Sequence, residues 1–532
     1  MNTVILGLDG ATWRVLDPLI DDGLLPNIEA LTEVGYSGTL SSTFPPVTAP
    51  AWLSMATGKN PGQTGVFYYL NRKHPDSFEY ETFGSEKYQG ESLWEVLNAS
   101  NDSMGIFNFP MLYPPYEIDG YMVSGLGSPE DETITYPPSL KDELDEVTDG
   151  YKINVPYADP KYSDAPEELA ADLLDALEQR EKAMLYLLNN KDVDVFFGVI
   201  SATDWAQHYF WKYHDDDHLL STPEGRTAHG EILTNIWKRA DETVGAVKTF
   251  ADENDAQLMI VSDHGFGKVE RTFYLNEWLE QQGFRQSDTS VQSYRAQYFP
   301  YIKKVGEAVV SVVPQLNDVA TSMGKKIKGT PEDSLDWENS IAYAPKHNVT
   351  CGMVHLLSDD PRDEEQVKTA LEGLKDDYGL DVNVHTREEL YSGENVELAP
   401  ELLFEINNFE CAVDPRHTTD NEVLKERPPH PARNGGHNTN GIFLFAGDSF
   451  RPGSGDTASL LDIAPTVLYL LGAPIPEEID GTVLTEAFED EFREKTSATV
   501  VPEAEIHGET QKAKGRDDLE DVKERLGDLG YI

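Results

Sequence analysis

Cysteines and basic residues are scarce in this chain of 532 residues. Two cysteines, Cys351 and Cys411, are too few for a disulfide framework or a zinc ribbon. There are 42 lysines and arginines against 95 acidic residues, and the resulting net charge of −53 argues against a general affinity for nucleic acid or anionic membranes. The acidic residues are spread along the chain. We interpret them as an adaptation to high salt, which screens self-repulsion, and therefore expect a halophilic source.

Long apolar runs are also lacking. No stretch approaches the roughly 20 apolar residues that a transmembrane helix needs. The segment 1–10 has neither a basic region nor a cleavage site of the kind found in signal peptides, and it leads directly into a core-like strand. We therefore expect a cytoplasmic protein with no membrane span and no nucleic-acid polymer as partner.

Short apolar runs alternate with helical patterns. The runs 4–8, 193–201 and 256–262 predict buried parallel strands, and 167–190 and 234–251 predict helices. Asp9, Asp204 and Asp263 follow the three runs closely. One such aspartate is a common turn residue. Three of them in an alternating pattern indicate a site at the carboxyl edge of an α/β sheet, where ligands gather.

A threonine-rich and proline-rich stretch, 43–52, precedes an apolar helical run that stops at Gly58. The pattern predicts a helix with Thr48 as its N-cap and Pro50 in its first turn. The Thr48 hydroxyl would then lie in the positive field of free backbone N–H groups, where an anion is stabilised. Taken alone, Thr48 could be an ordinary capping residue. Together with the aspartates, it is a candidate nucleophile.

Histidines accompany the aspartates. Asp204 and His208 are four residues apart and share a face of a helix, Asp263 and His264 are adjacent, and His437 lies in a predicted Gly/Asn/Pro loop. Imidazole and carboxylate groups suit first-row metals, and two metals are a familiar device for phosphoryl transfer. Individually, the Asp204–His208 pair could be a surface pair and His437 an ordinary loop histidine.

The combination resembles the alkaline phosphatase superfamily, and within it the type I phosphodiesterase/nucleotide pyrophosphatase branch. The motifs that carry the resemblance are Asp9 after the first strand, Thr48 with Thr57-Gly58, Asp204-x-x-x-His208, Ser262-Asp263-His264-Gly265 and Gly436-His437. Further segments, at 109–115, 274–278, 399–403 and 462–466, are similar to microbial members described as predicted phosphohydrolases or phosphomutases. The resemblance covers about residues 1–285 and 395–490.

The resemblance implies an α/β fold, with a mixed, mostly parallel sheet between helices and an inserted α+β cap. It implies two divalent metal ions. Zinc is the usual metal of the family, and manganese or iron would suit the same ligands. One ion would be held by Asp204, His208 and His437, and the other by Asp9, Asp263, His264 and the Thr48 oxygen. Thr48 would form a phospho-threonine that water resolves.

Three regions follow from this resemblance and from the change of character along the chain. We expect a discontinuous catalytic core at 1–285 and 401–490, and an inserted cap that sets substrate specificity at 286–400. We expect an acidic tail with one terminal helix at 491–532.

The loop after Gly58 departs from the family pattern. Nucleotide pyrophosphatases commonly have His-Gly in place of Thr64-Gly65, and a phosphate-binding asparagine where this chain has Tyr69. Candidate substrate contacts are therefore Lys59, Tyr69 and Asn108. The expected substrate is a small phosphate ester.

Four functions remain open at this point. A two-metal hydrolase of a phosphodiester or pyrophosphate bond fits best, and a phosphotransferase or phosphomutase would use the same residues. A sulfatase is disfavoured because Thr48 cannot be oxidised to formylglycine and Trp52 stands in place of an arginine. A non-catalytic binding protein would be favoured by the loss of a ligand residue, and all seven are present.

Overall fold

The computed structural model describes residues 1–532 except 130–132, 164, 288–334, 347–349, 508–518 and 530. The described residues form two compact units. The first unit comprises 1–270, 388–399 and 427–532, and the second comprises 271–387 and 400–426. These limits differ from the expected ones, because 271–285 and 401–426 group with the insertion, whereas 388–399 and 491–532 group with the core. The helix expected within 297–323 lies outside the described residues.

A ten-stranded sheet organises the first unit. In sheet order its strands are β20 (Gly453–Ser454), β2 (Tyr36–Ser41), β19 (Asn440–Ala446), β9 (Gln257–Val261), β1 (Thr3–Leu8), β8 (Val195–Ile200), β5 (Met104–Phe109), β6 (Gly120–Ser124) and β7 (Thr135–Tyr136), with β21 (Ala458–Ser459) beside β2. Strands β9, β1, β8, β5 and β6 are parallel, whereas β19 runs antiparallel to both β9 and β2. The mixed, mostly parallel sheet predicted from the sequence is confirmed.

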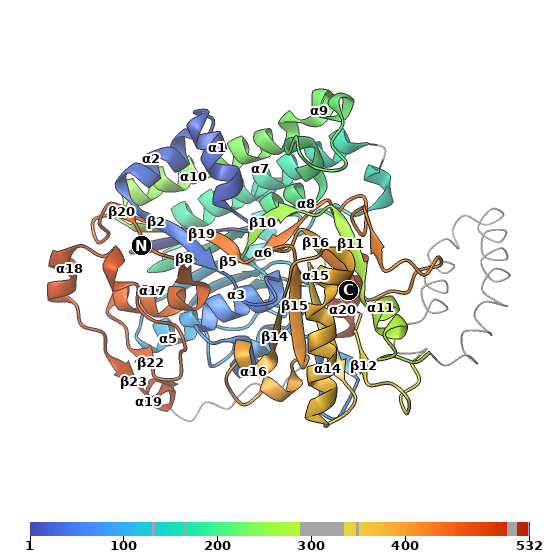
Figure 1. Cartoon of the computed structure of the whole chain (residues 1–532). Helices are drawn as coiled ribbons and strands as arrows, with labels where there is room; N and C mark the ends of the chain where they lie inside the picture. The colour runs from blue at the N-terminus through green and yellow to red at the C-terminus, as the bar shows by residue number, and fades with distance from the viewer. Residues whose placement is uncertain (130–132, 164, 288–334, 347–349, 508–518, 530) are drawn as a thin grey trace. The chain divides into compact units, whose positions relative to one another are not determined.

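Helices cover both faces of this sheet (Figure 1). One layer contains α1 (Trp13–Asp21), α2 (Pro26–Val34), α7 (Pro166–Asn190), α8 (Ala202–His214) and α10 (Glu231–Glu253). The other contains α3 (Thr48–Thr57), α5 (Leu93–Ala99) and α17 (Ile463–Leu471). The central strands are buried on both faces, which is why they read as continuous apolar runs in the sequence.

Helix α3 is buried along its whole length, as expected for a helix that is apolar on every side. Trp52 anchors it to the sheet. Its ring packs over β1 at Gly7, where an added Cβ would lie 2.4 Å from the indole, and its ring centroid lies 5.5 Å from that of Phe109. The absence of a side chain at Gly7 thus lets α3 lie directly against the sheet. The helix ends at Gly58, as predicted, and Gly58 adopts the left-handed conformation.

The second unit has its own apolar core. It contains two small sheets, β12-β13-β15-β14 and β16-β11-β17. Its strands are β11 (Arg271–Tyr274), β12 (Ala342–Tyr343), β13 (Cys351–Leu356), β14 (Val382–Thr386), β15 (Leu402–Ile406), β16 (Cys411–Asp414) and β17 (Leu424–Lys425). Its helices include α11 (Leu275–Gln281), α14 (Pro361–Glu372) and α15 (Leu374–Tyr378). Both cysteines are buried here and unpaired.

The chain segment after α17 is more structured than a simple acidic tail. It contains α18 (Asp490–Lys495), β23 (Val500–Val501), α19 (Glu503–His507) and α20 (Glu520–Asp528). Among the described residues, we find no helix with the length and apolar character needed to cross a bilayer.

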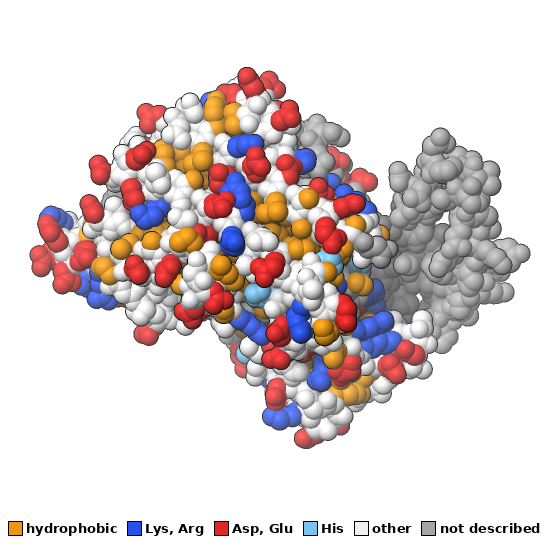
Figure 2. Space-filling model, turned by 90° about the horizontal axis from the view of Figure 1, so that it is seen from above, with side chains coloured by type: hydrophobic (Ala, Val, Ile, Leu, Met, Phe, Trp, Pro, Cys, Tyr) orange, Lys and Arg blue, Asp and Glu red, His pale blue; other side chains and the backbone are white. Residues whose placement is uncertain are grey.

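Acidic side chains are distributed over the visible face rather than gathered in one block (Figure 2). With a net charge of −53, this distribution predicts that self-repulsion opposes folding at low salt. We expect the melting temperature to rise as KCl increases from about 0.1 M to above 1 M, as the Debye length falls from ~10 Å to ~3 Å. Differential scanning calorimetry measures this. A melting temperature that is unchanged or lower in molar KCl would contradict the interpretation.

Candidate active site

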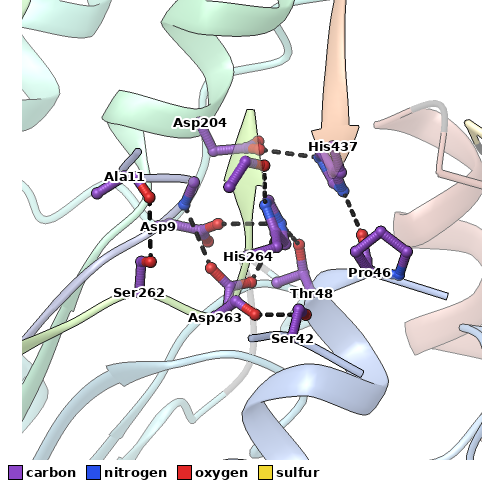
Figure 3. Close-up of polar contacts among 12 residues, drawn as sticks. Asp9, Ala11, Ser42, Pro46, Thr48, Asp204, Ser262, Asp263, His264 and His437 are labelled. Atoms are coloured by element: carbon purple, nitrogen blue, oxygen red, sulfur yellow. Dashed lines mark hydrogen bonds and ion pairs between the residues drawn. The ribbon is translucent and has the colours of Figure 1, made fainter. Parts of the chain in front are cut away.

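Three carboxylates meet at the carboxyl ends of three neighbouring strands. Asp9 directly follows β1, Asp263 follows β9, and Asp204 lies in the first turn of α8 after β8. All three are buried and point toward a common centre (Figure 3). The loops that carry them are fixed, since the Thr203 hydroxyl donates to the Asp9 carbonyl (2.7 Å) and the Ser42 hydroxyl to the Asp263 carbonyl (2.6 Å).

Helix α8 presents Asp204 and His208 to the same side, as their spacing predicted. His208 Nε2 lies 3.5 Å from Asp204 Oδ1. The other ring nitrogen of His208, Nδ1, lies 2.9 Å from the Gly435 carbonyl. Because a carbonyl can only accept, Nδ1 carries the proton, and Nε2 faces the site with its lone pair.

His437 is not in a loop, and that prediction was wrong. It lies on β18 (Gly435–Asn438), which pairs antiparallel with β10 (Gly265–Lys268) and places His437 opposite Phe266. Gly435, one of the glycines that suggested a loop, instead allows close packing on α8, since a Cβ there would lie 2.3 Å from the Gln207 carbonyl oxygen. This two-stranded ribbon brings His437 beside His264, with ring centroids 3.7 Å apart.

The nitrogen lone pairs of two histidines converge. His437 Nδ1 lies 3.0 Å from the Pro46 carbonyl and must donate to it, so Nε2 is again the unprotonated nitrogen. His437 Nε2 lies 3.0 Å from His208 Nε2 and 3.0 Å from Asp204 Oδ1. Two lone pairs and a carboxylate at this separation repel one another unless a cation lies among them.

Thr48 is the first residue of α3 and not its N-cap. Val47 occupies the cap position, so the predicted capping role was wrong by one residue. The Thr48 hydroxyl instead lies 3.4 Å from His264 Nε2. That nitrogen is 3.2 Å from Asp263 Oδ2 and 3.6 Å from Asp9 Oδ1. The hydroxyl is thus at the N-terminus of a buried helix, where the backbone field favours an anion, and beside the ligand cluster.

The electrostatics of the ligand cluster by itself are unfavourable. Among the residues that the structure describes, Asp9 Oδ1, Asp204 Oδ1 and Asp263 Oδ2 are buried without a hydrogen-bond partner. Burial, reinforced by the neighbouring Asp263, raises the pKa of Asp9 well above its usual value. Burial and the charge of Asp204 raise the pKa of Asp263 to about 7. Burial lowers the pKa of His208 to about 3. The raised carboxyl pKa values report a cost of ionising Asp9 and Asp263 that a bound cation would remove, and the lowered pKa of His208 keeps its imidazole in the neutral form that binds a metal.

The residues fit two cation sites. The ligand atoms of Asp204, His264 and His437 lie within 4.8 Å of one another, as do those of Asp9, Asp263 and His264. His208 adjoins the first group, because its Nε2 contacts both His437 and Asp204. His264 borders both groups, whereas the sequence placed it in one. Neutral imidazole and carboxylate are the donor set that zinc and related metals prefer.

Two of the expected substrate contacts have other partners. The buried Lys59 ammonium lies 3.3 Å from Glu91 and 3.0 Å from Glu503. The Asn108 amide donates to the Val199 carbonyl at 2.8 Å, and its oxygen accepts from Tyr151 at 3.3 Å. The third, Tyr69, is buried next to Thr48. Burial raises its pKa well above the usual value, and the Thr48 hydroxyl opposes that rise.

Sequence reasoning did not identify three residues beside the site. The Tyr157 ring stacks on that of His208, with centroids 5.2 Å apart and an interplanar angle of 4°. Tyr531 packs against Tyr69, and the positive charge of Arg433 acts on Tyr157, Tyr69 and Tyr531. Only Arg433, four residues before His437, had a nearby motif that could have drawn attention to it.

Comparison with known proteins supports the family resemblance. The model of the type I phosphodiesterase / nucleotide pyrophosphatase family matches residues 3–360. No curated protein matches the sequence significantly. Among solved structures, phosphonoacetate hydrolase from Sinorhizobium meliloti 1021 is similar in its complexes with phosphonoformate (13% identity) and with phosphonoacetate (14% identity).

Both alignments have a TM-score of 0.55 and cover 89% of this chain and 95% of the other, so the similarity in fold extends over nearly the whole of both proteins. The family match spans well over half of the sequence. The chain therefore belongs to the type I phosphodiesterase/nucleotide pyrophosphatase family and is a hydrolase of the alkaline phosphatase superfamily.

Proposed function

We propose that this protein is a two-metal phosphohydrolase that cleaves a phosphodiester or pyrophosphate-type bond through a phospho-threonine at Thr48. One observation carries the proposal. Three buried carboxylates and three histidine Nε2 atoms converge beside a threonine hydroxyl at a helix N-terminus. This is the donor set of a metal pair next to a nucleophile.

Asp204, His208 and His437 would hold one cation, and Asp9, Asp263 and His264 the other, with the Thr48 oxygen beside it. When bound, the two cations supply Lewis-acid charge next to the nucleophile and the phosphoryl oxygens. The protein residues fix the geometry. The carbonyls of Gly435 and Pro46 hold His208 and His437 in the tautomer that exposes Nε2.

The reaction has two displacement steps. The Thr48 oxygen attacks phosphorus, the bond from phosphorus to the leaving oxygen breaks, and the proton lost by Thr48 balances the departing alcohol. Water then attacks the phospho-threonine, which releases the phosphorylated product and restores the Thr48 hydroxyl. The amide N–H groups at the start of α3 favour the negative phosphoryl oxygens throughout both steps.

A phosphotransferase shares the first step and differs only in the acceptor that resolves the phospho-threonine. Adding an alcohol during turnover and identifying the products separates these two functions. Free phosphorylated product in proportion to substrate consumed supports hydrolysis, and a phosphorylated acceptor supports transfer.

Replacing the nucleophile tests the proposal directly. We expect Thr48→Ala to reduce turnover of a chromogenic phosphodiester by at least about 10³-fold, because the first displacement has no attacking oxygen. Bound metal, measured by mass spectrometry of the intact protein, stays near the wild-type amount. Thr48→Ser serves as the matched control and retains measurable turnover. Full activity of Thr48→Ala would refute the assignment of the nucleophile.

Removing the metals gives a second prediction. Without them, three buried carboxylates lose their compensating charge, so chelation lowers the melting temperature. The difference should widen between pH 5 and pH 8. In metal-free protein Asp263 has a pKa of about 7, above the unfolded value of about 4, so its contribution to stability is lost as the pH rises through 7. Scanning calorimetry at several pH values measures this.

Two histidine variants control the chelation experiment. His208→Ala should reduce the melting-temperature difference between loaded and chelated protein, because it removes a ligand nitrogen. His74→Ala should leave the difference unchanged, since His74 is exposed and pairs with the exposed Asp76. A pH-independent difference, or equal behaviour of the two variants, would contradict the assigned ligands.

A further inference from the structure

Two buried tyrosine hydroxyls lie at the candidate site. Tyr69 and Tyr157 are each about 1% exposed, and within the described part of the chain neither phenol oxygen makes a well-formed hydrogen bond, although Thr48 lies beside the first and Arg433 beside the second. Leaving a buried hydroxyl unsatisfied costs roughly 1–3 kcal/mol. Buried polar groups of this kind call for a ligand or a bound water.

The two phenols border opposite parts of the ligand cluster. Tyr69 lies next to the Thr48 hydroxyl, whereas Tyr157 stacks on His208. His264, adjacent to Thr48, contacts His437, and His437 contacts His208. A phosphoryl group bound at Thr48 would accept a hydrogen bond from the Tyr69 phenol. The Tyr157 phenol, stacked on His208, would then be available to a second acceptor on the same substrate.

Tyr69 is held in place by its own loop. Asn71 Oδ1 accepts from the backbone amides of Phe67 (2.7 Å) and Tyr68 (3.1 Å), and its Nδ2 donates to the Tyr68 carbonyl (2.8 Å). The phenol therefore reaches the site from a rigid turn. A rigid donor can impose the orientation of a ligand at little entropic cost.

A guanidinium group lies among these tyrosines. Arg433 precedes β18, and its neighbour Asn434 attaches the backbone to α8 by donating to the carbonyls of His208 (3.0 Å) and Tyr209 (2.6 Å). The positive charge of Arg433 acts on the phenols of Tyr157, Tyr68, Tyr531 and Tyr69, and opposes the burial that raises the pKa of Tyr157 to about 12.

Tyr531 completes the aromatic wall from a distant part of the chain. Its hydroxyl accepts from Trp205 Nε1 at 3.1 Å, and its carbonyl accepts from the Tyr68 hydroxyl at 3.1 Å. Its ring centroid lies 5.1 Å from that of Tyr69. Arg433 is itself only partly exposed, so water screens its charge less than it would screen a charge at the surface.

The side chains of Tyr69, Tyr157 and Arg433 offer hydrogen-bond donors and one positive charge, which together favour an anionic ligand. Phenol O–H groups and a guanidinium donate hydrogen bonds, and the guanidinium carries a fixed positive charge with the planar geometry that suits a carboxylate or phosphate. The rest of the protein is strongly acidic and repels anions in general. A local cluster of donors and positive charge beside the ligand residues therefore discriminates for an anionic substituent.

We propose that Tyr69, Tyr157 and Arg433 form an oxyanion subsite next to Thr48, which selects substrates that carry a second anionic group close to the reacting phosphorus. The proposal rests on the proposed function and adds the substrate class to it. The second group is a carboxylate or a phosphoryl group, joined by a short linker. The phenol of Tyr69 orients the reacting phosphoryl group, and Arg433 with Tyr157 binds the second anion.

A matched set of substrates tests the subsite. Three 4-nitrophenyl phosphodiesters differ only in their second substituent, which is carboxymethyl, phosphonomethyl or the neutral carbamoylmethyl. We expect wild-type kcat/KM to be at least about tenfold higher for one or both anionic esters than for the neutral one, as charge-assisted hydrogen bonds of this kind predict. The first two esters distinguish a carboxylate from a phosphoryl group.

Variants assign the preference to the named residues. Arg433→Met should reduce the ratio of anionic to neutral kcat/KM to near 1, and Tyr157→Phe, which keeps the ring on His208, should lower it several-fold. Arg451→Met is the control, since Arg451 packs over Tyr36 and should keep the wild-type ratio. Tyr157→Phe keeps the test valid if Arg433→Met does not fold.

The outcomes distinguish failure of the anion subsite from failure of the proposed hydrolase function. Equal wild-type rates on the three esters, or an unchanged ratio in Arg433→Met and Tyr157→Phe, would overturn the subsite while the hydrolase stands. No hydrolysis of any ester by wild-type protein, under conditions where metal is bound, would count against the proposed function itself.

Discussion

The burial of three carboxylates at one point is the constraint on which the rest of the site depends. Asp9, Asp204 and Asp263 are brought together because β9, β1 and β8 are neighbours in register and parallel, so that their carboxyl ends coincide. A buried charge without compensation costs several kcal/mol. Nearby histidines with Nε2 turned inward offer lone pairs rather than positive charge, so cations are the natural compensation.

The nucleophile and the ligands are connected through one strand. β19 pairs on one side with β9, which leads to Asp263 and His264, and on the other with β2, which leads through the 42–47 loop to Thr48. β18, which carries His437, directly precedes β19 in the chain and pairs with β10 after His264. The pairings of β19 therefore position Thr48, Asp263, His264 and His437 relative to one another.

Local sequence patterns predicted the parts of the site that depend on neighbours along the chain. The strand-end aspartates and the Asp204–His208 spacing follow from strand and helix periodicity. The placement of His437 in a loop failed because its glycines serve a tight strand pairing with β10, a contact between segments more than 160 residues apart in the sequence. The cap assignment of Thr48 failed because Val47 is the N-cap and Thr48 is already the first helical residue.

Tyr157 and Tyr531 could not be identified from the sequence for the same reason. No spacing connects a tyrosine at 531 with one at 69, and only tertiary packing brings their rings together. The second unit extends beyond the expected insertion because β15 pairs with β13, inside the insertion, and β16 pairs with β11, which precedes it. Periodicity carries no information about such long-range pairing.

The central claim is that the buried carboxylates and histidines hold two cations beside Thr48. Anomalous diffraction from zinc-loaded crystals, recorded on either side of the zinc absorption edge, measures this most directly. The account predicts two peaks, one bounded by Asp204, His208 and His437 and the other by Asp9, Asp263 and His264, with Thr48 adjoining the second. A single peak, or peaks away from these residues, would contradict it.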